Sequence, residues 1–494
     1  MIDDLPLWSC LPFVLLLACI AVLPLVPAAQ HLWEKRRVQL AVALLLGVPV
    51  GVGMWLSGGS TEVVHALVEY AQFIALLLAL FVVSGGIYIA GDLKAEPHVN
   101  LAFLACGAVL ASLIGTTGAA MLLIRPILRT NQQRTIKAHT VIFSIFIIAN
   151  CGGLLTPLGD PPLFLGMLRG VPFTWTLNLF PGWLLVNGLL LLIYWGLDRR
   201  AYAQEPEAAL ARDREDATPL HIVGKPQLLC FAAIIAAAAL VPSVNLEAIH
   251  AGGAAWHEWL PLRELVMLGA AALSYFFGSR KTRFELNAFS WSPILEVAAL
   301  FIGIFLTMVP ALVLLRQLAP SLPLNALTLF AFTGGLSSIL DNAPTYVTFF
   351  EMARELSFDG LRVAGVPVPY LVAISFGAVF GGAITYIGNG PNFMVKAVAE
   401  SARVPMPSFG GYVLRWSGAF YLPVLLTLAL VVIAEPLWLK LLGALLGAAI
   451  AACSLRMGVK YTRAAPAAPP CAQSENTAAA EDADAPKEDA VHGQ

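Results

Sequence analysis

The sequence predicts an all-α polytopic membrane protein with two inverted-topology repeats, each holding a re-entrant helical hairpin and a broken transmembrane helix. First, 59% of its 494 residues are hydrophobic and only 12% are charged, whereas about a quarter of the residues of a soluble globule are charged. Second, apolar windows of about 20 residues, long enough to cross roughly 30 Å of hydrocarbon, recur along the chain. Third, two windows are broken by glycines and prolines in the same pattern.

Taken in order, the apolar windows predict full or broken spans near 9–28, 38–57, 71–90, 137–158, 179–197, 227–243, 264–278, 293–318, 369–395, 416–434 and 436–455. No Lys or Arg precedes the first span, whereas Lys35, Arg36 and Arg37 follow it. Because basic residues are enriched in cytoplasmic loops, this asymmetry predicts an external N-terminus.

Two further apolar stretches, 99–128 and 322–350, are assigned by the charges that follow them. If both enter the membrane and return to the side they left, most basic residues and the C-terminus become cytoplasmic, in agreement with the positive-inside rule. We therefore predict two re-entrant hairpins that open from opposite faces. The basic residues left outside are then Arg169, Arg263, Arg316, Arg354, Arg362 and Lys440.

The two broken windows match residue by residue. Residues 152–162 read GGLLTPLGDPP and residues 381–391 read GGAITYIGNGP, so both follow GGxxTxxG[D/N]xP at an offset of 229. Matched stretches precede them in the same order, because ALFV at 79–82 parallels ALFI at 299–302 and the two hairpins follow. Interrupted apolar segments in corresponding halves are typical of the binding site of a secondary transporter.

These elements predict five regions of the chain. They are scaffold spans at 1–60, a first repeat at 61–197 (hairpin 99–128, broken helix 137–168), a charged cytoplasmic linker at 198–227, a second repeat with flanking spans at 228–455 (hairpin 322–350, broken helix 369–400), and a disordered cytoplasmic tail at 456–494.

Short oxygen-bearing side chains gather at the hairpin tips and the helix breaks, where freed backbone groups face a gap. Hydroxyl, amide and carboxylate oxygens can replace water around Na⁺. The alternatives are that a Thr or Asn only bonds a neighbouring helix, and that an Asp only caps the helix beside it. The predicted sodium or substrate ligands are Thr116, Thr117, Thr156, Asp160, Asp341, Asn342, Thr385 and Asn389.

Three carboxylates are candidates for carrying a proton, because a carboxylate at membrane depth is costly and its presence indicates function. Asp160 and Asp341 stand at the predicted half-helix junctions, and Glu296 stands near the start of its span, where it could equally be an interfacial residue in contact with water. The sequence thus predicts sodium ions, protons or both as coupling ions.

Other function classes find no support in the sequence. It contains no GxxxxGK[ST] loop, GxSxG elbow or metal-spaced His/Cys cluster, and its seven cysteines lack any CxxC spacing. A net charge of −2 without a basic stripe gives no argument for nucleic acid. We expect no enzyme activity, no catalytic residues and no cofactor apart from coupling ions.

With these motifs in hand, the chain resembles the ion transporter superfamily, and within it the citrate transporter and sodium:proton antiporter-like group. The resemblance lies in IGTTGAAMLLIRPILRTN at 114–131, GGLLTPLGDPPLFLGM at 152–167, LDNAPTYVTF at 340–349 and GGAITYIGNGPNFM at 381–394. It implies a homodimer in the cell (inner, cytoplasmic) membrane with a scaffold and a moving transport domain, and sodium or proton coupling. The Ser-Asn-Thr tip motif of the dicarboxylate symporters is absent.

The function predicted is that of a secondary active transporter, a sodium/proton antiporter with alternating access, because tip carboxylates compete for Na⁺ and H⁺ and repel citrate. The alternative is a sodium- or proton-coupled carrier of citrate or another dicarboxylate. From a different class, the chain could be a channel or a non-transporting scaffold. A channel requires rings of matched pore residues, and a scaffold has no need of broken helices.

Overall fold

The structure is a computed structural model that describes residues 5–23, 26–33 and 35–461. The tail predicted at 456–494 begins too early, because the helix Leu437–Lys460 continues to residue 460, and the part of it beyond residue 461 lies outside the described residues. The described residues are mostly helical, and seven of their helices are long and apolar enough to cross a membrane. These are Arg36–Leu56, Ser60–Ser84, Pro97–Ile114, Phe173–Tyr202, Ser292–Ser321, Phe409–Ile433 and Leu437–Lys460. The all-α polytopic prediction is therefore confirmed at this level.

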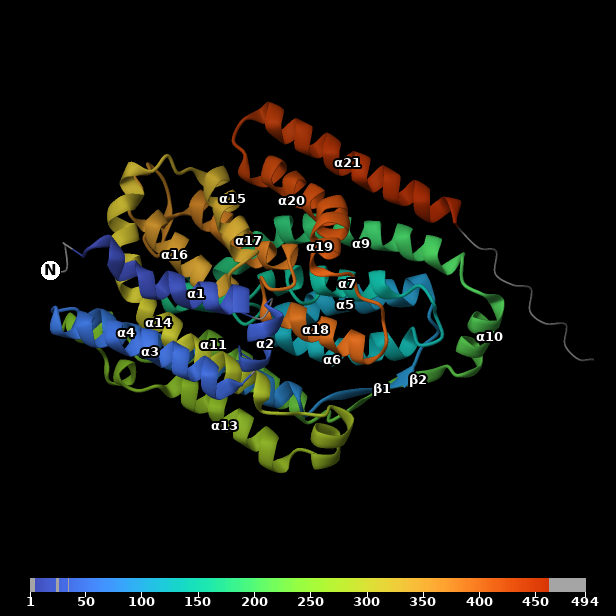
Figure 1. Cartoon of the computed structure of the whole chain (residues 1–494), viewed down its shortest axis with the longest axis horizontal. Helices are drawn as coiled ribbons and strands as arrows, with labels where there is room; N and C mark the ends of the chain where they lie inside the picture. Colours follow the sequence, from blue (N-terminus) through green and yellow to red (C-terminus); the bar gives the residue numbers. More distant parts are fainter. Residues whose placement is uncertain (1–4, 24–25, 34, 462–494) are drawn as a thin grey trace, which may run out of the picture. The chain divides into compact units, whose positions relative to one another are not determined.

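These spans and the other helices have the following bounds. The long ones in Figure 1 are α3 (Arg36–Leu56), α4 (Ser60–Ser84), α9 (Phe180–Tyr202), α14 (Ser292–Leu318) and α21 (Leu437–Lys460). Shorter ones are α1 (Leu11–Val22), α2 (Pro27–Trp33), α10 (Glu207–Glu215), α11 (Gln227–Leu240), α12 (Leu246–His250), α13 (Leu262–Phe277), α19 (Phe409–Gly411) and α20 (Leu422–Leu428). Short 3₁₀-helices include Leu7–Cys10, Phe173–Leu179, Trp256–Trp259 and Ala319–Ser321. The π-helical segments are Lys281–Leu286, Tyr412–Tyr421 and Ala429–Ile433.

Each stretch predicted as a hairpin consists of two helices with a sharp turn between them. In the first, α5 (Pro97–Ile114) and α6 (Thr116–Thr130) meet at Gly115, whose φ of +83° favours a glycine. In the second, α15 (Ala326–Ser337) and α16 (Asn342–Arg354) meet near Asp341. The turns lie where the sequence placed the hairpin tips.

Both predicted broken helices are interrupted in the structure. The first is α7 (Ala138–Ile147), a 3₁₀ turn at Cys151–Leu154, and α8 (Pro161–Leu168). The second is α17 (Val368–Gly381), a 3₁₀ turn at Gly382–Ile384, and α18 (Gly390–Ser401). A proline in the first turn restarts α8 and α18, since its missing N–H is lost there without cost.

The helices pack in closely approaching pairs, which Figure 1 shows for α21 alongside α9 and for α15 beside α17. Small residues permit close contact between α3 and α14: a Cβ added at Gly303 would lie 2.7 Å from the Ala43 Cβ. Small residues at helix interfaces are how membrane helices gain packing energy, because lipid removes the hydrophobic drive between helices.

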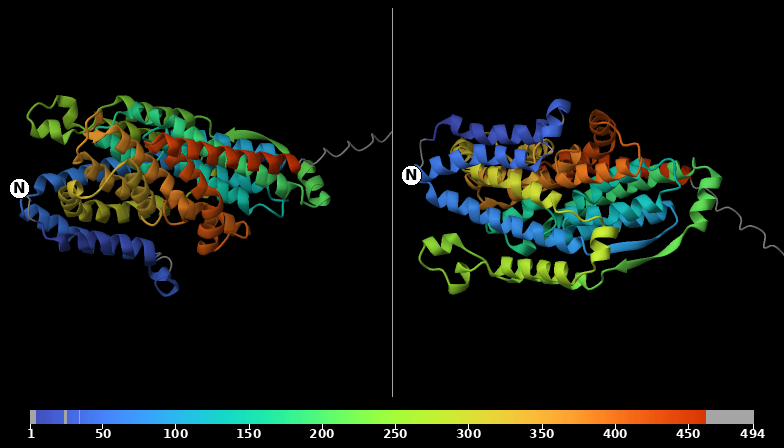
Figure 2. Two further views of the ribbon diagram at one scale, coloured as in Figure 1. Left: turned by 90° about the horizontal axis from the view of Figure 1, so that it is seen from above. Right: turned by 60° about the horizontal axis from the view of Figure 1, so that its bottom comes forward.

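One predicted span is wrong in its bounds. The prediction placed it at 71–90, but α4 ends at Ser84 and strand β1 (Tyr88–Asp92) follows. Strand β1 pairs antiparallel with β2 (Thr218–Val223), as Figure 2 shows. The predicted linker at 198–227 thus carries a strand as well as α10, and α9 continues into it. The two strands are far apart in the sequence, so no local sequence pattern predicts their pairing.

A buried cluster ties the end of α9 to the loop after α6. Asp198 pairs with Arg134 at 2.7 Å and with His139 at 2.8 Å, and its side chain is fully buried. Glu205, which follows α9, accepts bonds from the backbone N–H groups of Thr135 (2.9 Å) and Ile136 (2.8 Å). These bonds hold the start of the charged linker, which connects the two halves of the chain, against the neighbouring helices.

The Glu205 carboxylate makes the stability of this connection depend on pH. Burial alone would raise the pKa of Glu205, but the bonds from Thr135 and Ile136 lower that pKa below its usual range. A carboxyl whose pKa is lower in the folded protein adds stability above its unfolded pKa, about 4.3, and that stability is lost as the pH falls. We expect Glu205→Gln to lower the thermal midpoint in detergent by about 1–3 °C at neutral pH.

The same variant should also flatten the fall of the midpoint below about pH 5, because a glutamine side chain has no carboxyl group to be protonated. Glu215→Gln on exposed α10 is the control and should follow the unmodified protein. An equally steep fall in Glu205→Gln would contradict the assignment.

Candidate functional site

A cavity of about 370 Å³ lies where the hairpin tips and the helix breaks meet, and we call it the Asp160 cavity. Its walls include α4, α6, α8 and α14, and it reaches the starts of α6, α8, α16 and α18. Each helix start presents backbone N–H groups and a partial positive charge. Six of the predicted residues line it: Thr116, Thr117, Asp160, Glu296, Asp341 and Asn389.

Asp160 joins the two hairpin tips. One of its oxygens accepts a bond from the Thr116 hydroxyl at 2.9 Å, and the other accepts one from the Asn342 amide at 2.6 Å. The backbone N–H of Thr116 donates to the Gly159 carbonyl at 2.8 Å. Asp160 is only 1% exposed and stands before α8 without making a side-chain cap bond to it. Its carboxylate thus serves the site and not its own helix.

Asp341 behaves differently, since it caps the helix that follows it. Its side chain accepts the backbone N–H of Ala343 at 3.1 Å at the start of α16. This is the role that the sequence left open as the alternative for one of the two aspartates. Asp341 is also partly exposed and lines the Asp160 cavity, so it adds a carboxylate there while capping.

Glu296 and Asn389 reach the cavity from other elements. Glu296 is exposed near the start of α14 and accepts a bond from the Gln39 amide at 2.8 Å. The Asn389 amide donates to the Ala149 carbonyl and to the Asn150 side chain, both at 3.1 Å. Asn389 therefore connects the second break to the first.

Thr156 and Thr385 do not line the cavity. The Thr156 hydroxyl donates to the carbonyl of Ser112 on α5, and the Thr385 hydroxyl donates to the carbonyl of Ser338 at 2.5 Å. The structure thus gives both matched threonines the role of bonding a neighbouring helix, which sequence analysis had left open. They position the breaks from outside the cavity.

Sequence analysis missed two buried asparagines that link the breaks. The Asn150 amide donates to the Asn392 side chain at 2.7 Å, and the Asn392 amide donates to the carbonyls of Gly382 (2.8 Å) and Thr385 (3.0 Å). Both asparagines are fully buried. The sequence signal for them was a side-chain amide beside each helix break, because a buried amide requires hydrogen-bond partners.

The cavity is acidic. It carries the carboxylates of Asp160, Asp341 and Glu296, and the described residues that line it include no Lys, Arg or His. Beside Asp160, the buried side-chain oxygen of Asn342 has no hydrogen-bond partner among the described residues. A buried oxygen without a donor, next to a carboxylate and a hydroxyl, is a donor set that suits a small hard cation.

Comparison with known proteins identifies the family. Residues 2–433 match the model of a family described as "Putative citrate transport". The chain belongs to this family. It is a membrane transporter rather than an enzyme.

Two mycobacterial proteins are similar to this transporter. A "46 kDa membrane protein" of Mycobacterium leprae is 26% identical over 300 residues, which cover 58% of this chain and 66% of that protein, slightly less than two thirds of its length. An uncharacterized transporter of Mycobacterium tuberculosis is 26% identical over 343 residues, covering 65% of this chain and 73% of that protein.

Each of the two breaks of this transporter contains a close contact between two of its own glycines. A Cβ added at Gly159 would lie 2.0 Å from the Gly153 carbonyl oxygen, and one added at Gly388 would lie 2.7 Å from the Gly382 carbonyl oxygen. In each break the chain therefore folds back on itself at a distance that only glycine allows. This contact sets the position of the residue that follows each second glycine.

We expect Gly159→Ala to destabilise the transporter, because its methyl group would meet backbone that cannot move away cheaply. The cost of such overpacking is typically about 1–3 kcal/mol, measurable as a lower thermal midpoint in detergent. Gly390→Ala is the matched control, since it lies beside the second break with nothing within 4 Å of its added Cβ. Equal midpoints for the two variants would contradict this account of the break.

Proposed function

We propose that the chain is a sodium/proton antiporter in which Asp160 binds either Na⁺ or a proton. The observation that carries the proposal is the acidic cavity: three carboxylates face it, and no basic side chain does among its described lining residues. A polyanion such as citrate would meet repulsion there, whereas a cation would be attracted.

The residues around Asp160 suit this exchange. One hydrogen-bonded group contains the Asp160 carboxylate, the Thr116 hydroxyl and the unpaired Asn342 oxygen. Each of the three can coordinate Na⁺ through an oxygen atom. A proton on Asp160 removes its negative charge and with it the attraction for the ion. Loading by one cation therefore expels the other, and the two affinities are reciprocally linked.

Asp160→Asn is expected to abolish exchange. In liposomes, an imposed Na⁺ gradient should drive proton movement through the unmodified transporter and none above background through this variant. The fold should persist, because Asn389 stands at the corresponding break with nearly the same backbone, φ −152° and ψ 136° against −146° and 142° for Asp160.

Asp341→Asn is the second variant. Asparagine caps a helix about as well as aspartate, so loss of exchange in this variant would reflect charge rather than folding. We expect exchange to be lost here too. Sodium-driven proton movement at the unmodified rate in both variants would exclude the carboxylate mechanism.

A coupled carboxylate carrier is the second candidate, favoured by the description of the family and by the four helix starts around the cavity. Of these helices, α6 begins after Gly115 and α18 after Asn389, so their positive ends carry no carboxylate cap. Such ends can bind an anionic group. Uptake of radiolabelled citrate or succinate by the same liposomes, with no sodium-driven proton movement, would establish this alternative.

We further propose that the two halves are inverted repeats with re-entrant hairpins. The support is geometric: the glycine contacts match at the offset of 229, and both matched threonines bond the hairpin beside them. The resemblance stated above is the basis for a homodimer in the cell membrane. The N-terminus would be outside and the C-terminus in the cytoplasm.

A second cavity supports the assignment of faces. It has a volume of about 630 Å³, and its lining includes four of the basic residues predicted to be external, so we call it the arginine cavity. These residues come from separate elements, and their convergence on one cavity supports the prediction that they share one face of the protein. They are Arg169, Arg263, Arg316 and Arg354.

The topology has a direct test. In a background without native cysteines, Gln132→Cys after α6 and Glu355→Cys after α16 introduce thiols at exposed positions. Because each hairpin returns to the side that it left, an impermeant thiol reagent should label the first from the cytoplasm and the second from outside. Labelling of both from the same side would refute the inverted arrangement.

A further inference from the structure

The arginine cavity and the Asp160 cavity follow one another along the same two helices. On α4, Glu62, Glu69 and Gln72 line the arginine cavity, and the lining of the Asp160 cavity begins at Phe73. On α14, the lining of the Asp160 cavity ends at Ile304 and that of the arginine cavity begins at Phe305. The two cavities are therefore consecutive along one path.

Three phenylalanines stand between the cavities. The Phe73 ring lies 5.0 Å from Phe301 and 6.0 Å from Phe305, centroid to centroid, and the last two lie 6.4 Å apart. Phe73 is 0% exposed, Phe305 1% and Phe301 6%. The rings form a buried apolar layer, and a hydrophobic constriction of this kind can gate an ion path by dewetting.

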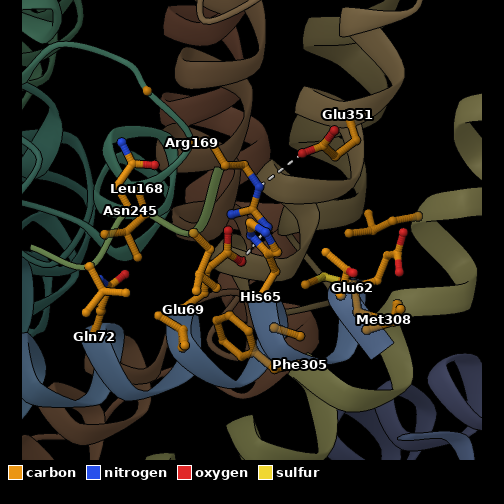
Figure 3. Close-up of a pocket in the computed structure, with 18 of the residues that line it drawn as sticks. Glu62, His65, Glu69, Gln72, Leu168, Arg169, Asn245, Phe305, Met308 and Glu351 are labelled. Atoms are coloured by element: carbon orange, nitrogen blue, oxygen red, sulfur yellow. Dashed lines mark hydrogen bonds and ion pairs between the residues drawn. The ribbon is translucent and has the colours of Figure 1, made fainter. Parts of the chain in front are cut away.

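Ion pairs link the elements around the arginine cavity, and Figure 3 shows Arg169 between Glu69 and Glu351. Arg169, just after α8, pairs with Glu69 of α4 at 2.7 Å and with Glu351 of α16 at 3.1 Å. Arg316 of α14 pairs with the same Glu351 at 2.7 Å. Their side chains are mostly buried, apart from Arg316 at 41% exposed.

The three pairs fall into two kinds. Arg169 with Glu351 joins α8 to α16, which also pack against each other and carry Asp160 and Asn342 at their starts. The pairs of Glu69 with Arg169 and of Arg316 with Glu351 instead join this unit to α4 and α14. Movement of α8 and α16 away from α4 and α14 would break only the second kind.

We propose that the arginine cavity is the outer vestibule of the transport path, and that its two bridging ion pairs, with the phenylalanine layer, form a gate that is closed in this structure. This rests on the proposed transport function, because a path to Asp160 must open on each face in turn. The gate opens when Glu69 releases Arg169 and Arg316 releases Glu351, while Arg169 and Glu351 stay paired and move together.

Thiol accessibility tests the gate without any transported ion. Thr117→Cys, in a background without native cysteines, places a reporter in the Asp160 cavity. An impermeant thiol reagent applied from the vestibule side should modify it slowly. Adding Glu69→Gln or Arg316→Gln weakens the closed state, so we expect modification to accelerate about tenfold.

Glu62→Gln is the matched control, because Glu62 lies on the same helix and lines the same cavity but takes no part in these ion pairs. Its modification rate should equal that of the reporter alone. If Glu69→Gln misfolds, Phe73→Ala provides the same readout by thinning the ring layer. Rapid modification of the reporter before any gate variant, or unchanged rates in Glu69→Gln, Arg316→Gln and Phe73→Ala, would overturn the gate.

The outcome is separable from that of the transport proposal. A reporter that responds to the gate variants in a protein without sodium-driven proton movement would support the gate and refute the antiport. Sodium-driven proton movement that depends on Asp160, together with an unresponsive reporter, would support the antiport and refute the gate.

Discussion

Unpaired backbone groups inside a membrane protein are the constraint on which this structure depends. Each interrupted helix frees N–H and C=O groups at a depth where no lipid can pair them, and each unpaired group costs several kcal/mol. Side chains from neighbouring elements provide the partners. Asn392 donates to two carbonyls of its own break, Asn150 donates to the Ile145 carbonyl, and Ser112 donates to the Gly152 carbonyl. These buried polar side chains therefore pair backbone groups that the helix breaks leave free.

These partnerships also couple the two halves. The first break holds Asn150, which bonds Asn392 of the second break, and Asn389 bonds back to the first. Asp160 likewise receives one bond from each hairpin tip. A site assembled from four elements cannot change its ligand without affecting all of them, which is what coupling between ion binding and movement requires.

Sequence analysis predicted this arrangement as far as local signals reach. Glycines and prolines located both breaks, and the matched tips predicted that Thr116, Asp160 and Asn342 would meet. The side-chain directions of Thr156 and Thr385 were not predictable, because they depend on where α5 and α15 pack. The pairing of β1 with β2 and the link between Asn150 and Asn392 join distant segments. Such contacts follow from the assembled fold and leave no periodic pattern in the sequence.

Whether the Asp160 cavity attracts a cation or an anion depends on how the four helix starts around it are capped. Each start contributes a partial positive charge that falls off within one turn. Asp160 precedes α8 and Asp341 precedes α16, so a full negative charge stands at two of the four starts. The four helix starts together contribute about two positive charges, roughly half a charge each, and the two aspartate carboxylates balance them. The Glu296 carboxylate adds a third negative charge to the cavity. The electrostatic balance of the cavity is therefore negative until a cation enters, and a carboxylate substrate would have to enter together with cations that neutralise it.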